Sequence, residues 1–303
     1  MINLTDLQKE IQGAFPGVEI RMEEPLSRHT SFKIGGPCEV FALPKTEEEL
    51  SCLLAWAKRK GVAPAILGSG TNVLAADEGY RGLIVCTRAM GERLEQTEPE
   101  ILKASAGVTL ARLASFAASL GLGGLEFAHG IPGSVGGGLY MNAGAYGGEM
   151  KQVTLSTRYM DMEGKTHVLE GEAQDFSYRH SAFTGKPWII IEGTFKMTPK
   201  PEAEIREAMQ ALLEKRRASQ PLDLASAGST FKRPVGGYAA ALIDQAGLKG
   251  FRVGDAAVST KHAGFVVNLG QATAEDVLTL IEEIKKRVLD TSGILLEPEV
   301  VRL

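Results

Sequence analysis

The chain has 303 residues, of which 44% are hydrophobic and 23% charged, and its formal net charge is −4 at pH 7. This length favours two domains, and this composition is typical of a soluble globular protein. Because the balance is slightly acidic and no dense basic run is present, we expect no nucleic-acid partner. No apolar run approaches the ~18 residues that span a bilayer, so we expect no membrane insertion.

The cysteines and histidines exclude two further classes of protein. Cys38, Cys52 and Cys86 are far apart and form no CxxC motif, which argues against a disulfide framework and for a reducing compartment. The five histidines have no zinc-site spacing, so we expect no metal. The first ten residues, MINLTDLQKE, lack a basic-then-apolar signal pattern, and we expect a cytoplasmic protein.

Hydrophobic periodicity predicts amphipathic helices separated by short strands, and hence an α+β or α/β chain. Thr46 and Glu49 form a capping box at the start of the first helix, and Thr273 with Asp276 stands at the start of the last. In chain order we predict a helix over 46–61, strands over 63–67 and 82–86, a helix over 109–121, a strand over 188–195, a helix over 201–218, a strand over 264–269 and a helix over 273–293.

Each predicted helix has one apolar face, which we expect to be buried. The four faces are Leu50, Leu53, Leu54 and Ala57; Leu110, Leu113, Ala114, Ala117 and Leu120; Ile205, Met209, Leu212 and Leu213; and Val277, Leu280, Ile281, Ile284 and Val288. The segment KMTPKPE (196–202) has two prolines between a strand and a helix, so we divide the chain into regions 1–198 and 199–303.

Glycine is enriched in two segments. The chain has 35 glycines, about 12% against a usual ~7%, and eight lie in GIPGSVGGGLYMNAGAYGGE (130–149). The second segment, LGSGTNVLA (67–75), follows a predicted strand. A strand followed by a glycine turn and small polar residues is typical of an anion cradle, because bare N–H groups point at the ligand. The alternative is that both segments are space-filling tight turns.

Neither segment has a common nucleotide fingerprint. No GK[ST] closes either loop, and no position in the chain satisfies GxGxxG, since Val73 stands where the third glycine would be. A P-loop and a Rossmann dinucleotide loop are therefore excluded.

At these residues a resemblance becomes specific. GSGTNVL (68–74), GLEFAHGIPGSVGGGLYMNAGAYG (124–147) and HTSFKIGGPCEVF (29–41) resemble the FAD-binding region of the vanillyl-alcohol-oxidase-type flavoproteins. Within that superfamily they resemble the UDP-N-acetylenolpyruvoylglucosamine reductase family, and the match covers essentially the whole chain. The resemblance implies an α+β fold: a two-subdomain FAD-binding region (1–198, boundary near 85) and a C-terminal substrate-binding domain (199–303).

The resemblance also implies the cofactor and the residues that hold it. FAD is expected to be bound non-covalently, because 68–72 lacks the histidine used for covalent attachment elsewhere in the superfamily. NADPH is expected as the co-substrate. The cofactor-binding residues are expected to be Gly68, Ser69, Gly70, Thr71, Asn72, Gly130, Ile131, Pro132, Gly133, Ser134, Gly136, Gly137 and Ala143.

Three further segments match the family's catalytic motifs. DFSYRHSAF (175–183) implies Arg179 in the active site, ASAGSTFKRP (225–234) implies Ser229 as the proton donor, and LLEPEVVRL (295–303) implies Glu299. The family reduces UDP-N-acetylglucosamine enolpyruvate to UDP-N-acetylmuramate for peptidoglycan synthesis. This chemistry needs a cation for the charge that grows on the substrate carboxylate and a proton donor for the neighbouring carbon.

The same motifs imply substrate contacts at Tyr178, Lys232, Arg233 and Tyr238, although many relatives carry Asn where this chain has Arg233. Only 50 positions separate Arg179 from Ser229, which resembles the family's shorter, second type and predicts a more open site. Taken singly, each residue has a structural alternative, such as a surface ion pair for Arg179 or a turn for Ser229.

Two other functions stay open from the sequence. One is a different flavin oxidoreductase of the same superfamily that acts on an alcohol or aldonolactone. The other is a non-catalytic binder of UDP-sugars or flavin, which the presence of all three catalytic candidates disfavours.

Overall fold

The computed structural model describes residues 11, 13–15 and 17–303 of the chain. The chain forms two compact units, each built from segments that are distant in sequence. The first unit contains the described residues up to Met22, Val40–Ser69 and Gly82–Glu214. The second contains Glu23–Glu39, Gly70–Arg81 and Lys215–Leu303.

These two units differ from the predicted regions 1–198 and 199–303, because each unit is built from three separate segments of the chain. Pro199, the first of the two prolines of 196–202, is part of strand β14 (Thr198–Pro199), which pairs with β8 (Leu122–Gly123) inside the first unit. Helix α5 (Glu202–Ser219) carries the chain from the first unit into the second. The functional division into an FAD-binding region over 1–198 and a substrate-binding domain over 199–303 stays a prediction, as does the subdomain boundary near 85.

The first unit holds a five-stranded antiparallel sheet and most of a four-stranded sheet in which β3 and β5 pair in parallel. The boundary between the units falls inside β1, β2 and β5 of the four-stranded sheet. The strands of the five-stranded sheet, in sheet order, are β12 (Thr166–Glu170), β11 (Thr154–Met160), β13 (Ile189–Lys196), β7 (Ile101–Ser105) and β6 (Leu94–Glu98). Those of the four-stranded sheet are β1 (Glu19–Pro25), β2 (Pro37–Leu43), β5 (Tyr80–Cys86) and β3 (Ala65–Leu67).

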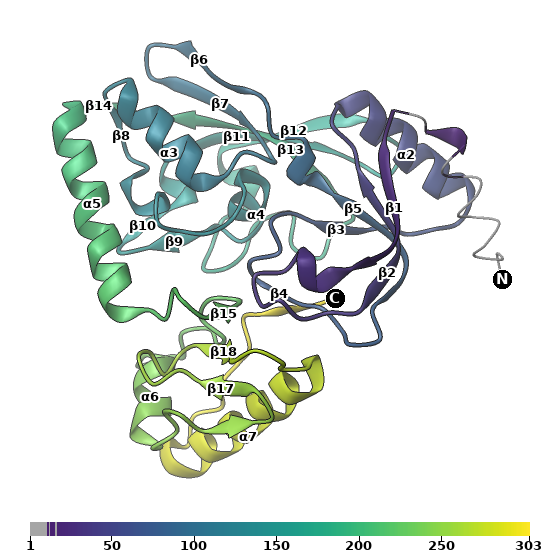
Figure 1. The fold of residues 1–303 in the computed structure, drawn as a ribbon. Coiled ribbons are helices and arrows are strands. Elements are labelled where there is room, and N and C mark those ends of the chain that lie inside the picture. The colour runs from purple at the N-terminus through teal and green to yellow at the C-terminus, as the bar shows by residue number, and fades with distance from the viewer. Residues whose placement is uncertain (1–10, 12, 16) are drawn as a thin grey trace. The chain divides into compact units, whose positions relative to one another are not determined.

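The first unit also contains α2 (Glu47–Arg59), α3 (Leu110–Ser119) and α4 (Val135–Tyr140), together with the larger part of α5. Helix α4 contacts β7 and β13, and Figure 1 shows α3 and α4 beside the strands of the five-stranded sheet. One core cluster joins α3 and α4 to that sheet, and another joins α2 to the four-stranded sheet. The short pair β9 (Gly144–Ala145) and β10 (Gly148–Glu149) follows α4.

The second unit is built around a small antiparallel sheet. Its strands, in sheet order, are β15 (Ala225–Ser226), β18 (Val266–Asn268), β17 (Ala256–Val258) and β16 (Arg252–Val253). Helices α6 (Ala239–Gln245) and α7 (Ala274–Ser292) contact each other, and α7 packs against β16 and β17 (Figure 1). The last strand, β19 (Val301–Arg302), pairs in parallel with β4 (Val73–Leu74). Short 3₁₀ turns lie at Leu26–Arg28, Thr87–Ala89, Glu126–Ala128, Met150–Gln152 and Gly171–Gln174.

The predicted helix starts are confirmed, and most of the predicted faces are buried. Thr46 and Thr273 cap α2 and α7 in complete capping boxes with Glu49 and Asp276. Leu120 was expected on the buried face of α3 but is 38% exposed, because the helix ends at Ser119. Leu212 and Leu213 of α5 are only half-buried, whereas Ile205 and Met209 are buried as expected.

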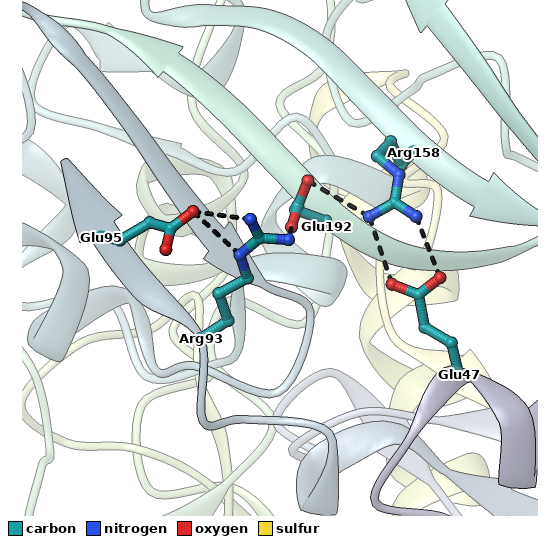
Figure 2. Close-up of polar contacts among 5 residues, drawn as sticks. All are labelled: Glu47, Arg93, Glu95, Arg158 and Glu192. Carbon is teal, nitrogen blue, oxygen red and sulfur yellow. Dashed lines mark hydrogen bonds and ion pairs between the residues drawn. The ribbon is translucent and has the colours of Figure 1, made fainter. Parts of the chain in front are cut away.

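An ion-pair network ties α2 to the five-stranded sheet (Figure 2). Glu192 on β13 is 3% exposed and accepts from Arg158 and Arg93, with N···O distances of 3.3 and 3.1 Å. Arg158 also donates through both terminal nitrogens to Glu47 in the first turn of α2, and Arg93 pairs with Glu95. A buried carboxylate is costly unless it is paired, and these two arginines supply the partners of Glu192 inside the unit.

Candidate active site

The short glycine loop needs glycine at position 70 for two reasons. Gly70 has φ +64°, a backbone conformation that side chains other than glycine rarely adopt. A Cβ atom there would lie 1.9 Å from the carbonyl oxygen of His29, which is backbone and cannot move aside. His29 is itself held by a 2.7 Å hydrogen bond between its ring and Glu24, and the Ser31 N–H donates to the Gly70 carbonyl. The motif HTSFK therefore packs directly behind this loop.

The loop leaves backbone donors unused. Within the described part of the chain, the N–H groups of Ser69, Gly70 and Asn72 donate to no protein acceptor. Backbone N–H groups are rarely left without a partner in a folded protein. Consecutive free N–H groups are the feature that a phosphate group uses.

The long glycine segment begins as a loop and continues as a short helix that was not predicted. Gly133 has φ +149°, and Ser134, 1% exposed, is the N-cap of α4. Among the described residues, the N–H groups of Gly133 and Ser134 have no protein acceptor. The donor pattern of the short loop thus recurs at 133–134.

Packing accounts for two glycines of α4. A Cβ atom at Gly136 would lie 3.0 Å from the Cβ of Ala106, and one at Gly138 would lie 3.1 Å from Leu110. The Gly136 N–H is also used inside the protein, since it donates to the Ala106 carbonyl at 2.9 Å. Gly136 and Gly138 are therefore explained by the approach of Ala106 and Leu110 of the protein itself. Cofactor contact at Gly136 and Gly137 stays a prediction.

Arg179 stands at the tip of a two-residue turn in the first unit. Ser177 and His180 exchange two backbone hydrogen bonds of 3.2 Å, which leaves Tyr178 and Arg179 between them. Arg179 has φ +56°, a conformation that costs a non-glycine residue on the order of 1–3 kcal/mol and is often found at functional sites. The Tyr178 ring, 51% exposed, lies 5.2 Å from the guanidinium carbon.

Ser229 and Glu299 lie on neighbouring segments of the second unit. The Glu299 N–H donates to the Thr230 carbonyl at 2.8 Å, and Phe231 and Pro298 form a β-bridge. In the described chain the half-buried hydroxyl of Ser229 makes no hydrogen bond. The structure therefore brings together two of the three predicted catalytic residues.

The short glycine loop joins the same group of segments. The Asn72 side chain donates to the Glu299 carbonyl at 3.2 Å, and the Val301 N–H donates to the Asn72 carbonyl at 3.0 Å. The segment 297–301 thus lies between 230–232 and 72–74. Nothing in the local sequence pattern predicted this long-range pairing.

The predicted substrate-binding cations of the second unit have protein partners. Lys232 forms an ion pair with Glu297, whose side chain is 68% exposed. The Arg233 guanidinium carbon lies 4.5 Å from the Tyr238 ring centroid, a cation–π distance. Both contacts are near the surface, and surface pairs contribute little stability, so an incoming anion can compete for these cations.

His129 is the titratable group that precedes the long glycine segment. Burial lowers the pKa of His129, and the positive charge of Arg206 lowers it further. Its Nδ1 atom is buried and has no hydrogen-bond partner. The ring is therefore neutral near pH 7.

The described residues contain neither a cluster that could hold a metal ion nor a helix that could cross a membrane. No group of three or more His, Cys, Asp or Glu side chains there is arranged to hold a metal ion. Within the same part of the chain, no helix is long and apolar enough to cross a membrane.

Comparison with known proteins decides the family. Residues 38–170 match the family model for an FAD binding domain, and residues 220–303 match that for the C-terminal domain of UDP-N-acetylenolpyruvoylglucosamine reductase. The reductase of Agathobacter rectalis is 44% identical over 303 residues, with 96% of each chain covered. The chain belongs to the UDP-N-acetylenolpyruvoylglucosamine reductase family.

Two more relatives support this membership. A UDP-N-acetylenolpyruvoylglucosamine reductase 2 of Symbiobacterium thermophilum is 46% identical, covering 94% of this chain and 92% of the relative. The crystal structure of the reductase from Thermus caldophilus has a TM-score of 0.77 at 35% identity and covers 94% and 98% of the two chains. The predicted fold class, an α+β chain with an FAD-binding region and the family's C-terminal domain, is confirmed.

The residues present fit an FAD pyrophosphate. Five backbone N–H groups, at Ser69, Gly70, Asn72, Gly133 and Ser134, have no protein acceptor in the described chain. The loop at Gly70 has no room for a side chain, so the backbone itself is presented. Taken unit by unit, Ser69, Gly133 and Ser134 of the first unit and Gly70 and Asn72 of the second each present backbone donors of the kind that a phosphate group uses.

Asn142 and Ser181 are polar residues that the sequence analysis missed. Both are buried, and both connect the end of the long glycine segment to the turn that carries Arg179. For Asn142 the sequence signal was polarity within an otherwise apolar and glycine-rich stretch, whereas Ser181 lies in the polar segment 175–183 and has no such signal.

Proposed function

We propose that this protein reduces UDP-N-acetylglucosamine enolpyruvate to UDP-N-acetylmuramate in the synthesis of peptidoglycan precursors, with FAD as cofactor and NADPH as electron donor. Family membership over nearly the full length carries the proposal. The open backbone donors of the two glycine segments support it independently. When bound, FAD supplies the hydride chemistry that connects NADPH to the terminal carbon of the enolpyruvyl group.

Arg179 is proposed to hold the carboxylate of the enolpyruvyl group. Addition of hydride to the terminal carbon pushes negative charge toward this carboxylate, and a guanidinium stabilises that charge with two parallel hydrogen bonds. The left-handed conformation at the tip of the turn supports the role, because strained backbone persists where the surrounding structure fixes it.

Ser229 is proposed to protonate the carbon next to the carboxylate. That carbon becomes strongly basic once the hydride has been added, so a serine hydroxyl is acidic enough to donate to it. The hydroxyl makes no hydrogen bond within the described chain and is therefore ready to donate. Overall, the carbon–carbon double bond gains one hydride and one proton and becomes a single bond.

Glu299 is proposed to act beside Ser229. The Glu299 N–H is fixed to the carbonyl of Thr230, the residue after Ser229, so the carboxylate is carried on the neighbouring segment. From there it can share a proton with the substrate or orient the serine.

Substrate contacts are proposed for Tyr178, Lys232, Arg233 and Tyr238. Lys232 and Arg233 would exchange their surface partners for the diphosphate of the nucleotide. A cytoplasmic location stays a prediction, supported by three cysteines that are all free.

Substitution of Ser229 by alanine separates the two halves of the reaction. We expect NADPH to bleach the flavin absorbance of Ser229→Ala at close to the native rate. The recovery of absorbance on addition of enolpyruvyl substrate should slow by about 10²–10⁴-fold, the usual contribution of a general acid.

Ser226→Ala is the matched control, because Ser226 lies three residues earlier, is assigned no chemical role, and its hydroxyl accepts a long 3.5 Å hydrogen bond from the Gly228 N–H. It should leave both phases native. A loss of less than about tenfold in the recovery phase of Ser229→Ala would show that another group donates the proton.

A further inference from the structure

Asn142 connects three segments of the first unit through its side chain. Its Nδ2 atom donates to the Ser177 carbonyl at 3.0 Å and to Oε2 of Glu149 at 3.1 Å. Its Oδ1 atom accepts from the Lys151 N–H at 2.9 Å. The residue is 1% exposed, so water cannot replace these partners.

The first of these contacts fixes the base of the turn that carries Arg179. Ser177 begins that turn, and its carbonyl accepts from both His180 N–H and the Asn142 amide. On the far side of the turn, the fully buried hydroxyl of Ser181 donates to the Tyr140 carbonyl at 2.7 Å. The turn is therefore tied on both sides to the residues where α4 ends.

The backbone at Asn142 is specialised for this contact. Asn142 has φ +42°, and asparagine is one of the few non-glycine residues that adopt this region readily. The left-handed conformation reverses the chain after α4, and the side chain then faces Ser177 and Glu149. Aspartate has the same shape but lacks the two N–H donors.

We propose that Asn142 is a positioning residue for Arg179: its amide holds the turn against the end of the long glycine segment and so fixes where the guanidinium stands. The inference rests on the proposed catalytic role of Arg179. A long side chain at the tip of a two-residue turn is mobile unless the base of the turn is fixed. Misplacement of a catalytic group by about 1 Å can cost on the order of 10²-fold in rate.

Two variants test the role of the hydrogen bond from the Asn142 amide to the Ser177 carbonyl. Asn142→Asp removes both donors and sets a carboxylate against the oxygens of Glu149 and Ser177. Asn142→Gly suits the positive φ and introduces no charge, so it covers the case in which the aspartate variant folds poorly. Thr154→Val is the control, because it removes one buried hydrogen bond of the same unit, to the Met150 carbonyl, without contact to the turn.

The first readout is hydrogen exchange of the FAD-loaded protein, which does not depend on activity. The amides of Ser177 and His180 close the turn, and both should exchange at least about tenfold faster in the two Asn142 variants. Thr154→Val should leave them at the native rate. Native exchange at both amides in both variants would overturn the inference.

The second readout is steady-state kinetics with the UDP-sugar substrate. The variants should lose about 10–100-fold in kcat, with KM within about threefold and the flavin content unchanged, because only placement of the guanidinium is altered. In an Arg179→Ala background, Asn142→Asp should cost less than about twofold further, since the residue to be positioned is gone.

The outcomes distinguish this inference from the proposed function. Losses that multiply in the double variant would overturn the inference alone, because Asn142 would then act independently of Arg179. Native turnover in Arg179→Ala by itself would overturn the proposed role of Arg179 and the inference with it.

Discussion

The two glycine segments use glycine for different physical reasons. In the short loop, Gly70 is required by its positive φ and by backbone 1.9 Å from where a Cβ would stand. In the long segment, Gly136 and Gly138 make room for Ala106 and Leu110, and Gly133 has a positive φ. Glycine density therefore marks close approach, but the approaching group is the protein itself at some positions and, we propose, the cofactor at others.

The comparison separates two effects that a single substitution would otherwise mix. A side chain that collides with protein lowers stability with or without FAD. A side chain that collides with the cofactor lowers FAD affinity and leaves the apoprotein intact. Measuring apoprotein stability and FAD affinity for a variant at each glycine therefore shows whether protein or cofactor lies against that position.

Gly70→Ala should have the largest effect. Alanine is strained at φ +64° and its Cβ would overlap the His29 carbonyl, so we expect a stability loss on the order of 3 kcal/mol and weak FAD binding. Gly13→Ala is the control, since a Cβ there would meet nothing within 4 Å and the residue is assigned no part in binding. Chemical denaturation and flavin content measure the two effects, and native values for Gly70→Ala would contradict the assigned geometry.

Gly136→Ala should have an intermediate effect on stability. Its Cβ would press on Ala106, and overpacking of a buried site typically costs about 1–3 kcal/mol. The second substitution Ala106→Gly removes the methyl group that is in the way and should recover part of the loss. Equal losses in the single and double variants would mean that the two residues do not compete for space.

Gly137→Ala should change the stability of the apoprotein by a smaller amount and should increase it. A Cβ there would meet the Ser134 hydroxyl at an ordinary 3.6 Å, and alanine is favoured over glycine within a helix by up to ~1 kcal/mol. The apoprotein should melt at a higher temperature, whereas FAD affinity should fall if this position contacts the cofactor as the family resemblance implies. A less stable apoprotein would contradict the packing at α4.

His129→Gln should have the smallest effect, a change in how the stability of the protein depends on pH. Because burial lowers the pKa of His129, the unfolded chain takes up a proton before the folded one as the pH falls through ~6.5. Stability is therefore lost on acidification, and melting at pH 7.5 and 5.5 should differ less in His129→Gln than in the native protein. His262, whose pKa burial also lowers, stays in both proteins. An identical pH dependence in the two proteins would show that His129 does not contribute to the loss of stability on acidification.

Local patterns in the sequence predicted local structure. The capping boxes at Thr46 and Thr273, the apolar faces of α2 and α7 and the buried strand β13 all follow from short-range periodicity. The family resemblance then supplied the candidate residues Arg179, Ser229 and Glu299, which no periodicity marks.

The parts that escaped prediction depend on contacts distant in sequence. Pairing of β19 with β4 joins residues more than 200 positions apart, and two residues per strand carry no pattern. The hydrogen bonds of the Asn142 and Ser181 side chains depend on how the end of α4 packs against the turn that carries Arg179. The positive φ of Arg179 is a conformation that arginine rarely adopts. Such features are fixed by tertiary packing, which local propensity does not encode.

The absorbance spectrum of the purified protein under anaerobic conditions follows the proposed reaction at the flavin itself. We predict a flavin spectrum that bleaches on addition of NADPH and returns on addition of UDP-N-acetylglucosamine enolpyruvate, with one UDP-N-acetylmuramate formed for each flavin reoxidised. A spectrum that returns only when oxygen is admitted, and not with the enolpyruvyl substrate, would contradict the account and favour an oxidase acting on another substrate.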